Sequence, residues 1–202
     1  AYIESLSGLT NVVQNSLGNT THISTMDENG NCAALTTSLG ESAGMILKNT
    51  GVVLNNFLGE ADVAHPELMK HPGHRLLTMC TPTILETDSS TWVLGSGGSN
   101  RIPGILMQVI RNLIHGSTLE EAIVHPRFHT NLDEDGQLKE ILAEQLSVQD
   151  RMVLEQEYPK IDFKVFNELN LYFGGVHMVG MERGELKGFG DPRRNGYCLY
   201  SL

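Results

Sequence analysis

Two adjacent threonines, Thr20 and Thr21, lie where a polar, glycine-containing stretch gives way to a run of β-branched residues. A threonine hydroxyl is a weak nucleophile until a base removes its proton, and the free amine of an N-terminal threonine can be that base. Thr20 would gain this amine if the chain were cut after Asn19. Threonine pairs also begin many ordinary strands, so the pattern alone leaves a purely structural role open.

A glycine-rich segment, Gly-Ser-Gly-Gly-Ser at 95–99, is the second candidate for chemistry. Glycines between a strand and a helix expose backbone N–H groups beside a helix N-terminus, which suits an anion or a developing oxyanion. The segment lacks the Gly-Lys-Ser/Thr ending of a Walker loop and the glycine spacing of a dinucleotide-binding fingerprint. A tight turn with positive φ is the structural alternative.

The histidines and cysteines favour structural roles. No carboxylate or cysteine lies at a ligand spacing beside His71 and His74, so we expect no metal site and no cofactor. The three cysteines are Cys32, Cys80 and Cys198. Because their wide spacing gives neither a zinc motif nor a disulfide framework, they are expected to be small, buried or half-buried thiols.

The composition is ordinary for a folded globular protein. The 202 residues, of which 40% are hydrophobic and 19% charged, are enough for one sizeable core. A formal net charge of −10 gives no broad attraction to phosphates, so no nucleic acid is expected as a partner. No apolar run approaches the roughly 18–20 residues of a membrane-spanning helix, so none is expected. The composition leaves the compartment undecided.

The order of turns and apolar patterns predicts the elements that would position these residues. β-Branched runs bounded by turn residues predict one hairpin at 21–38 and a second at 82–94. Apolar stripes with caps predict helices that begin at Pro103 and at a capping box over 117–120, and a third helix at 148–158. Further expectations are strands at 51–55, 176–181 and near 197–200, a long loop at 59–75, an ion-pair turn at 191–194, and a short helix with a linker in 1–19. Strands at both ends with helices between them indicate sheets stacked against helices in an α+β or α/β layered domain.

Taken together and in order, several segments resemble the small subunit of γ-glutamyltransferases. The segment 18–24 resembles the self-processing site of that family, and 27–33 resembles the hairpin that follows it. Further matches in the expected order are 53–56, 75–83, 95–101, 126–129 and 190–193. The resemblance covers nearly all of residues 18–194, and its strength lies in the collinear order rather than in any one motif.

The resemblance implies an α+β fold of a specific kind, the four-layered αββα sandwich of N-terminal-nucleophile hydrolases, with this chain forming roughly its C-terminal half. Residues 1–19 would be the end of the large-subunit region and the processing linker, and residues 20–202 the small-subunit catalytic domain. The expected partner is a large-subunit chain or an upstream segment of the same precursor. A dimer of such heterodimers is a further assembly that the resemblance leaves open.

The resemblance also implies roles for individual residues. The precursor would cut itself between Asn19 and Thr20, and the freed Thr20 would attack a γ-glutamyl amide to form an acyl-enzyme, which water or an amine then resolves. Ser38 falls where the family carries a hydroxyl residue that hydrogen-bonds the nucleophile. Gly97 and Gly98 fall on the pair that supplies the oxyanion hole, in agreement with the anion-binding character of their loop.

The substrate-binding positions depart from the family pattern. Gly40 stands where asparagine is usual, and Glu60 replaces an aspartate. Phe57 stands where a polar residue is common, and Leu77-Thr78 replaces two serines, which keeps one hydroxyl, at Thr78. A pocket that hydrogen-bonds charged groups discriminates strongly, whereas an apolar one discriminates little. The changes therefore weaken the expectation that glutathione is the substrate, and they leave the nucleophile and the oxyanion residues intact.

We therefore expect an autoprocessed threonine-nucleophile amidohydrolase or acyltransferase that cleaves γ-glutamyl, glutathione-like or related N-acyl amides. Two alternatives stay open. One is an enzyme like the cephalosporin or glutaryl acylases, with the same nucleophile and a different acyl pocket. The other is an unprocessed, non-catalytic scaffold subunit, in which the peptide bond to Asn19 would deny Thr20 its basic amine.

Overall fold

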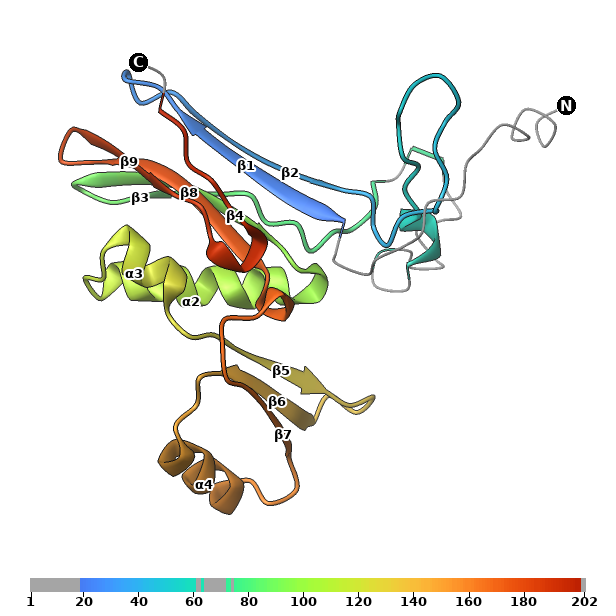
Figure 1. Ribbon diagram of the computed structural model, residues 1–202, viewed down its shortest axis with the longest axis vertical. Coiled ribbons are helices and arrows are strands. Elements are labelled where there is room, and N and C mark those ends of the chain that lie inside the picture. Colours follow the sequence, from blue (N-terminus) through green and yellow to red (C-terminus); the bar gives the residue numbers. More distant parts are fainter. Residues whose placement is uncertain (1–18, 61–62, 64–71, 74, 201–202) are drawn as a thin grey trace, which may run out of the picture.

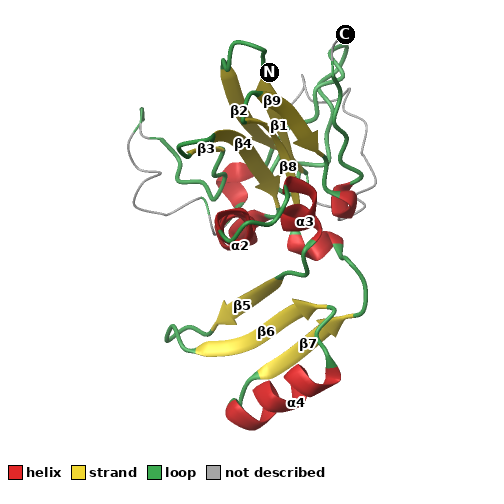
Figure 2. Ribbon diagram, turned by 90° about the vertical axis from the view of Figure 1, so that its left-hand side faces the viewer, coloured by secondary structure: helices red, strands yellow, loops and turns green. Residues whose placement is uncertain are grey.

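The computed structural model of the protein describes residues 19–60, 63, 72–73 and 75–200 (Figure 1). The short helix and linker expected before Asn19 lie outside the described residues, as does most of the loop expected at 59–75, with His71 and His74. The described elements form a larger layered body and a smaller sheet with one helix (Figure 2).

The first hairpin consists of β1 (Thr20–Met26) and β2 (Cys32–Ser38), as predicted. Asp27 fixes its turn, because Oδ1 of this residue accepts hydrogen bonds from the N–H groups of Asn29 and Asn31 at 2.9 and 2.8 Å. The antiparallel register sets Thr20 directly opposite Ser38. The hairpin therefore carries these two hydroxyl residues together at its open end, away from the turn.

The central sheet is antiparallel, in the order β3–β4–β8–β9. Its strands are β3 (Thr83–Glu86), β4 (Ser90–Gly97), β8 (Gly175–Glu182) and β9 (Glu185–Phe189). β4 is buried from its third residue onward, because it lies between β3 and β8 at the centre of the layered body. The hairpin predicted at 82–94 and the strand predicted at 176–181 are confirmed.

The closing strand is β9, and the strand expected near 197–200 is wrong. After β9 the chain reverses through η5 (Pro192–Arg194), where Gly190 and Gly196 meet backbone to backbone. Beyond this turn no strand forms at 196–200, although Cys198 lies against Gly188 of β9, and Tyr197 and Leu199 are 85% and 84% exposed. The segment at 197–200 thus lies beside β9 without forming a strand ladder with it.

Two layers cover the central sheet. The β1–β2 hairpin packs on one face against β4 and β8, while α2 (Ile102–Ile114) and α3 (Leu119–Val124) cover the other face (Figure 1). The main core lies between the sheet and the helices, and its fully buried members include Leu94, Ile105, Val109, Phe173, Val176 and Met178. The predicted α+β class is therefore confirmed. The described residues form a layer from the β1–β2 hairpin, a layer from the central sheet and a layer from α2 and α3.

The capping box of α3 begins at Thr118, one residue later than the box predicted over 117–120. The hydroxyl of Thr118 accepts a hydrogen bond from the Glu121 N–H at 3.2 Å, and the Glu121 carboxylate accepts one from the Thr118 N–H at 2.9 Å. This register turns Ala122 and Ile123 into the core, where they are 1% and 0% exposed. Burial of these two residues therefore selects the later of two neighbouring caps.

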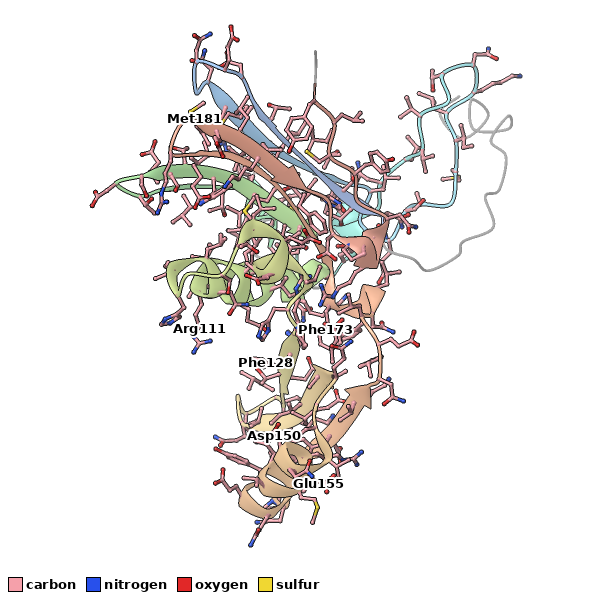
Figure 3. The ribbon with its side chains drawn as sticks, turned by 60° about the vertical axis from the view of Figure 1, so that its left-hand side comes forward. Arg111, Phe128, Asp150, Glu155, Phe173 and Met181 are labelled. Atoms are coloured by element: carbon pink, nitrogen blue, oxygen red, sulfur yellow. The ribbon has the colours of Figure 1, made fainter. Side chains whose placement is uncertain are left out.

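The smaller sheet has the order β5–β6–β7, with β5 (Phe128–Leu132), β6 (Leu138–Glu144) and β7 (Asp162–Phe166) (Figure 2). β6 and β7 are parallel, and the predicted third helix, α4 (Val148–Glu157), makes the crossover between them. α4, with Asp150 and Glu155, lies at the opposite end of the molecule from Met181 on β8 (Figure 3). The sequence did not indicate these strands, because charged residues such as Glu140 interrupt their apolar pattern.

The strand expected at 51–55 is wrong. Within this segment only Val53 forms a β-bridge, with Ile46. The segment belongs to a long excursion between β2 and β3 that joins none of the sheets, and Val52 is 53% exposed. Three backbone hydrogen bonds join 52–54 to 43–47, but this pairing does not extend into a regular strand.

Four charged side chains form a buried network where the two parts of the protein meet. Arg127, directly before β5, donates through Nη2 to Asp191 at 2.6 Å. Arg193 donates to Glu144, at the end of β6, through Nη2 at 2.5 Å and through Nε at 2.8 Å. Each of these side chains is at most 1% exposed, so two positive and two negative charges are balanced away from water.

The network also binds backbone groups of several elements. Asp191 Oδ2 accepts from the Val176 N–H on β8 at 2.8 Å, and Glu144 Oε1 accepts from the Asn170 N–H at 2.6 Å. Both arginines donate to the carbonyl of Ile123 in α3. The ion pairs of the 191–194 turn, expected to be local, therefore reach across the fold.

A separate buried polar group lies between the hairpin and the central sheet. The ring of His22 on β1 is hydrogen-bonded through Nδ1 to the Thr36 hydroxyl and through Nε2 to the Ser24 hydroxyl, both at 2.8 Å. Gly95 makes room for it, since a Cβ there would collide with the imidazole. Burial, and secondly the neighbouring His177, lower the pKa of His22 from 6.5 to about 4, so the ring is neutral at pH 7.

Replacing Arg193 should destabilise the protein strongly. Arg193→Gln leaves Glu144 as an unpaired buried charge, which costs about 3–5 kcal/mol of unfolding free energy. Urea denaturation would measure this loss. The control is Arg151→Gln, which breaks the half-exposed 2.7 Å pair with Glu155 on α4 and should cost less than about 1 kcal/mol. Equal, small losses in both variants would contradict a stabilising role for the network.

Stability should fall as the pH decreases from about 6.5 to about 4, because of His22. In this window the unfolded chain binds a proton at this residue that the folded protein excludes, so unfolding takes up close to one extra proton. Urea denaturation at several pH values would show a steeper loss in the wild type than in His22→Gln. Parallel pH dependences in the two proteins would show that His22 is not the titrating group.

Candidate active site

The centre of the site is a pair of hydroxyl groups. Thr20 Oγ1 and Ser38 Oγ are hydrogen-bonded at 2.8 Å across the open end of the β1–β2 hairpin. Ser38 Oγ also accepts a hydrogen bond from the Gly40 N–H at 3.0 Å. These two bonds hold the Thr20 hydroxyl in one orientation, which a nucleophile requires.

The peptide groups on both sides of the Thr20 hydroxyl are also held. The Asn19 carbonyl accepts a hydrogen bond from the Leu39 N–H at 3.0 Å. The Thr20 carbonyl accepts one from Nη1 of Arg194 at 3.1 Å. A donor already in place on the Asn19 oxygen would stabilise negative charge there, if the Asn19 carbonyl carbon were attacked.

The glycine loop lies against Thr20. Gly97 ends β4, and a Cβ added to it would lie 2.6 Å from the Thr20 carbonyl oxygen, so no larger residue fits. Gly98 follows with a φ of 143°, a conformation that side chains rarely adopt. The short helix η3 (Ser99–Arg101) and then α2 begin directly afterwards. The loop therefore brings backbone N–H groups and the start of α2 beside the hydroxyl pair.

These groups open onto one cavity of about 610 Å³. Residues predicted from the sequence that line it are Asn19, Thr20, Ser38, Gly40, Glu60, Thr78 and Gly98, and Phe57 lines it as well. Gly97 is not among the lining residues and lies behind Thr20. The cavity lies where the start of β1 meets the excursion between β2 and β3. The fold thus brings the predicted residues together from distant segments.

Gly40 and Glu60 fit each other in the cavity wall. Gly40 has a φ of 66°, and a Cβ on this residue would collide with the Glu60 carboxylate. A small residue at position 40 therefore makes space for the longer acidic side chain at position 60. Oε1 of Glu60 is buried and has no hydrogen-bond partner within the described part of the chain. A cationic ligand group would satisfy that oxygen.

Two arginines of the cavity, Arg101 and Arg194, were missed by sequence reasoning. Arg194 belongs to the turn expected to hold only ion pairs, and its neighbour Arg193 does join the buried network. A 3₁₀ turn has three residues per turn, so adjacent side chains point in different directions. One arginine therefore enters the core and the next enters the cavity. The doubled arginine within a short turn was the only signal available.

Other surfaces of the described residues offer less chemistry. They contain no group of three or more His, Cys, Asp or Glu side chains that could hold a metal ion. They also contain no helix that is both long and apolar enough to cross a membrane. A larger groove of about 790 Å³ lies beside α2 and β5, and its lining mixes apolar side chains such as Met107 and Phe128 with polar ones such as Arg111.

Sequence comparison places the chain among known proteins. The family model described as gamma-glutamyltranspeptidase matches residues 4–201. The glutathione hydrolase proenzyme of Bacillus subtilis (strain 168) is 29% identical over 194 residues, which cover 90% of this chain and 31% of that protein. The acylase ACY 1 proenzyme of Pseudomonas sp. (strain SE83) is 33% identical over 117 residues, covering 55% of this chain and 21% of that protein.

A solved structure extends the similarity to the fold. The crystal structure of the Bacillus anthracis transpeptidase enzyme CapD matches with a TM-score of 0.70 at 29% identity, covering 90% of this chain and 99% of the crystallised chain. The chain spans about a third of the length of the curated relatives it matches. Since the family model covers nearly the whole chain, and enzymes of this kind are similar to it in sequence and fold, the chain belongs to the gamma-glutamyltranspeptidase family.

Proposed function

We propose that this chain is the catalytic part of an autoprocessed threonine-nucleophile amidohydrolase or acyltransferase that acts on γ-glutamyl amides. The observation that carries the proposal is the oriented Thr20 hydroxyl, hydrogen-bonded to Ser38 and opening onto a cavity beside a glycine loop. Membership of the family and the proenzyme relatives support it.

Self-cleavage is the first reaction of the proposed enzyme. Thr20 Oγ1 attacks the Asn19 carbonyl carbon, while the Leu39 N–H stabilises the charge that develops on the oxygen. The peptide nitrogen leaves as the amine of Thr20 and takes up a proton, which gives an ester between the two residues. Water hydrolyses this ester, so that Asn19 ends in a carboxylate and Thr20 keeps its hydroxyl and a free amine.

Turnover uses the same hydroxyl. The free amine takes the proton of Thr20 Oγ1 as the oxygen attacks the substrate amide, and the leaving amine then receives a proton. The backbone N–H groups of Gly97 and Gly98 are assigned to the oxyanion, because the loop lies against Thr20 and provides no competing side chains. Ser38 keeps the nucleophile oriented. Water or an acceptor amine resolves the acyl-enzyme.

The part of the cavity wall that the excursion between β2 and β3 forms is proposed to bind the γ-glutamyl group. The buried, unpartnered Oε1 of Glu60 suits the α-ammonium of that group. The Thr78 hydroxyl, which accepts from the Cys80 N–H at 3.1 Å, still has its proton to donate. Phe57 adds an apolar surface. This mixture of charged and apolar residues supports a γ-glutamyl substrate, with glutathione as one candidate among several.

The second candidate, a glutaryl or cephalosporin acylase, is favoured by the similarity to the acylase proenzyme. The two reactions share the nucleophile and differ in the acyl group, since a glutaryl group lacks the α-ammonium that Glu60 would bind. The unprocessed scaffold is the non-catalytic alternative. It differs from both enzymes in a simple respect, because its peptide bond between Asn19 and Thr20 would persist.

An upstream segment or large-subunit chain is proposed to pack on the outer face of the hairpin. The central sheet carries helices on one face only, and Ile23 and Leu35, paired on the outer face of β1 and β2, are 52% and 58% exposed. A helical layer on that face would bury them and complete a four-layered αββα sandwich. The proenzyme relatives, which are about three times as long, support such a partner.

Thr20→Ala should abolish both self-cleavage and turnover in the full-length protein. Intact mass and N-terminal sequencing would find one uncut chain, and γ-glutamyl-p-nitroanilide would be hydrolysed only at the background rate. The matched control is Thr87→Ala, because this residue is exposed in the turn between β3 and β4, away from the hairpin, and should retain both reactions. Cleavage in Thr20→Ala would overturn the proposal, and an uncut, inactive wild type would favour the scaffold.

Glu60→Gln should distinguish the two enzymatic candidates. The change keeps the side-chain size and removes the charge, so the KM for γ-glutamyl-p-nitroanilide should rise about tenfold or more relative to that for a glutaryl anilide. Glu86→Gln, at an exposed position of β3, is the control. If both substrates were affected to the same extent, Glu60 would not recognise the ammonium group. A wild type that prefers the glutaryl compound would favour the acylase.

A further inference from the structure

The groove beside α2 and β5 exposes large apolar side chains outside the candidate active site. Met107 and Ile114 on α2 are 68% and 67% exposed, and Phe128 on β5 is 53% exposed. All three line the groove, whose volume is about 790 Å³. Apolar side chains that gather in one exposed groove mark an interaction surface more often than a free one. The groove is therefore a candidate for docking.

The charged side chains of the groove are positive. No Asp or Glu of the described residues lines it, although the whole chain has a net charge of −10. Arg111 lines the groove and forms no ion pair within the described part of the chain. The charge of Arg127, which also lines it, is balanced by Asp191 in the buried network. The groove therefore complements an apolar surface that carries acidic side chains.

The edge of β5 in the groove favours a helix over an extended strand as the occupant. The Phe128 N–H donates to Oε1 of Gln108 at 3.0 Å, and the Phe128 carbonyl accepts from Nε2 of Gln108 at 2.9 Å. Both backbone groups are thus directed to α2 and are already satisfied. A strand added beside β5 would need them, whereas an amphipathic helix docks through its side chains alone.

The helix α4 of the same sequence has the matching surface. Val148 and Met152 lie one turn apart on α4, are 70% and 64% exposed, and therefore share a face. Asp150 and Glu157 on this helix form no ion pair among the described residues. α4 lies beyond the smaller sheet and lines no part of the groove of its own chain (Figure 1). Only α4 of another copy could fill it.

We propose that two copies of the protein form a symmetric dimer in which α4 of each copy packs into the α2–β5 groove of the other. The apolar face of α4 meets Met107, Ile114 and Phe128, and its acidic side chains lie near Arg111. A twofold axis makes both contacts at once, so assembly closes at two copies and both surfaces are covered. The proposal does not depend on the proposed function, because none of these residues lines the cavity that holds Thr20.

The mass of the full-length protein tests the dimer. Light scattering after size-exclusion chromatography should give the mass of two copies. Met107→Glu and Met152→Glu each place a charge in the apolar contact and should raise the dissociation constant of the dimer about tenfold or more. Thr87→Glu, in the exposed turn between β3 and β4, adds the same charge elsewhere and should leave the dimer intact. A monomeric wild type, or a dimer that neither replacement weakens, would overturn the proposal.

Cross-linking tests the contact itself without adding charge. Met107→Cys and Met152→Cys are prepared separately and mixed, and a short bismaleimide should then join the two new thiols, as mass spectrometry of the linked peptides would show. Neither variant alone should give a link between two new thiols. A dimer that lacks the mixed link would assign the interface to another face and overturn the proposal. A monomer in which the thiol of Met107→Cys resists alkylation would assign the groove to the upstream part of the precursor instead.

Discussion

The buried pairing of Arg127 with Asp191 and of Arg193 with Glu144 is the interaction on which the rest of the structure depends. Such a cluster is costly to desolvate and is tolerated only when every charge finds a partner. Here the partners come from segments before β5, at the end of β6 and after β9, so the network forms only when those segments meet. Its geometry also decides where Arg194 lies, since that residue follows Arg193 in one short turn.

The candidate site is assembled by backbone geometry more than by side-chain contacts. The hairpin register sets Thr20 opposite Ser38, and the end of β4 sets a glycine loop against the Thr20 carbonyl. Both constraints belong to ordered sheets, which hold a nucleophile more precisely than a free loop would. Substrate recognition is assigned instead to the excursion between β2 and β3, which joins no sheet. In the proposed function, the chemistry thus belongs to the ordered sheets and the specificity to a segment outside them, so the acyl pocket could change while the nucleophile stays in place.

The sequence predicted what local patterns determine. Turn residues around Asp27 predicted the first hairpin, and the apolar stripe after Pro103 predicted α2. The predicted site positions lie together around the cavity, with Gly97 just behind it, because they were identified by an ordered resemblance to a family. Elements that depend on distant partners were missed. Polar or charged residues interrupt the apolar pattern of β5, β6 and β7, and the 51–55 segment pairs only irregularly with 43–47 and joins none of the sheets. Nor could spacing reveal that Arg193 and Arg194 point into different environments.

The bond between Arg194 and the Thr20 carbonyl joins residues 174 positions apart in the chain. β4 likewise obtains its neighbour β8 only after some 80 further residues have been made. A ribosome must therefore synthesise the chain as far as Arg194 before the Thr20 region is fixed against the central sheet. The proposed self-cleavage would then report that the chain has been made and folded at least as far as the turn after β9. An interrupted or misfolded chain would stay a single, inert polypeptide, and its nucleophile would never be released into the cell as an unassembled fragment.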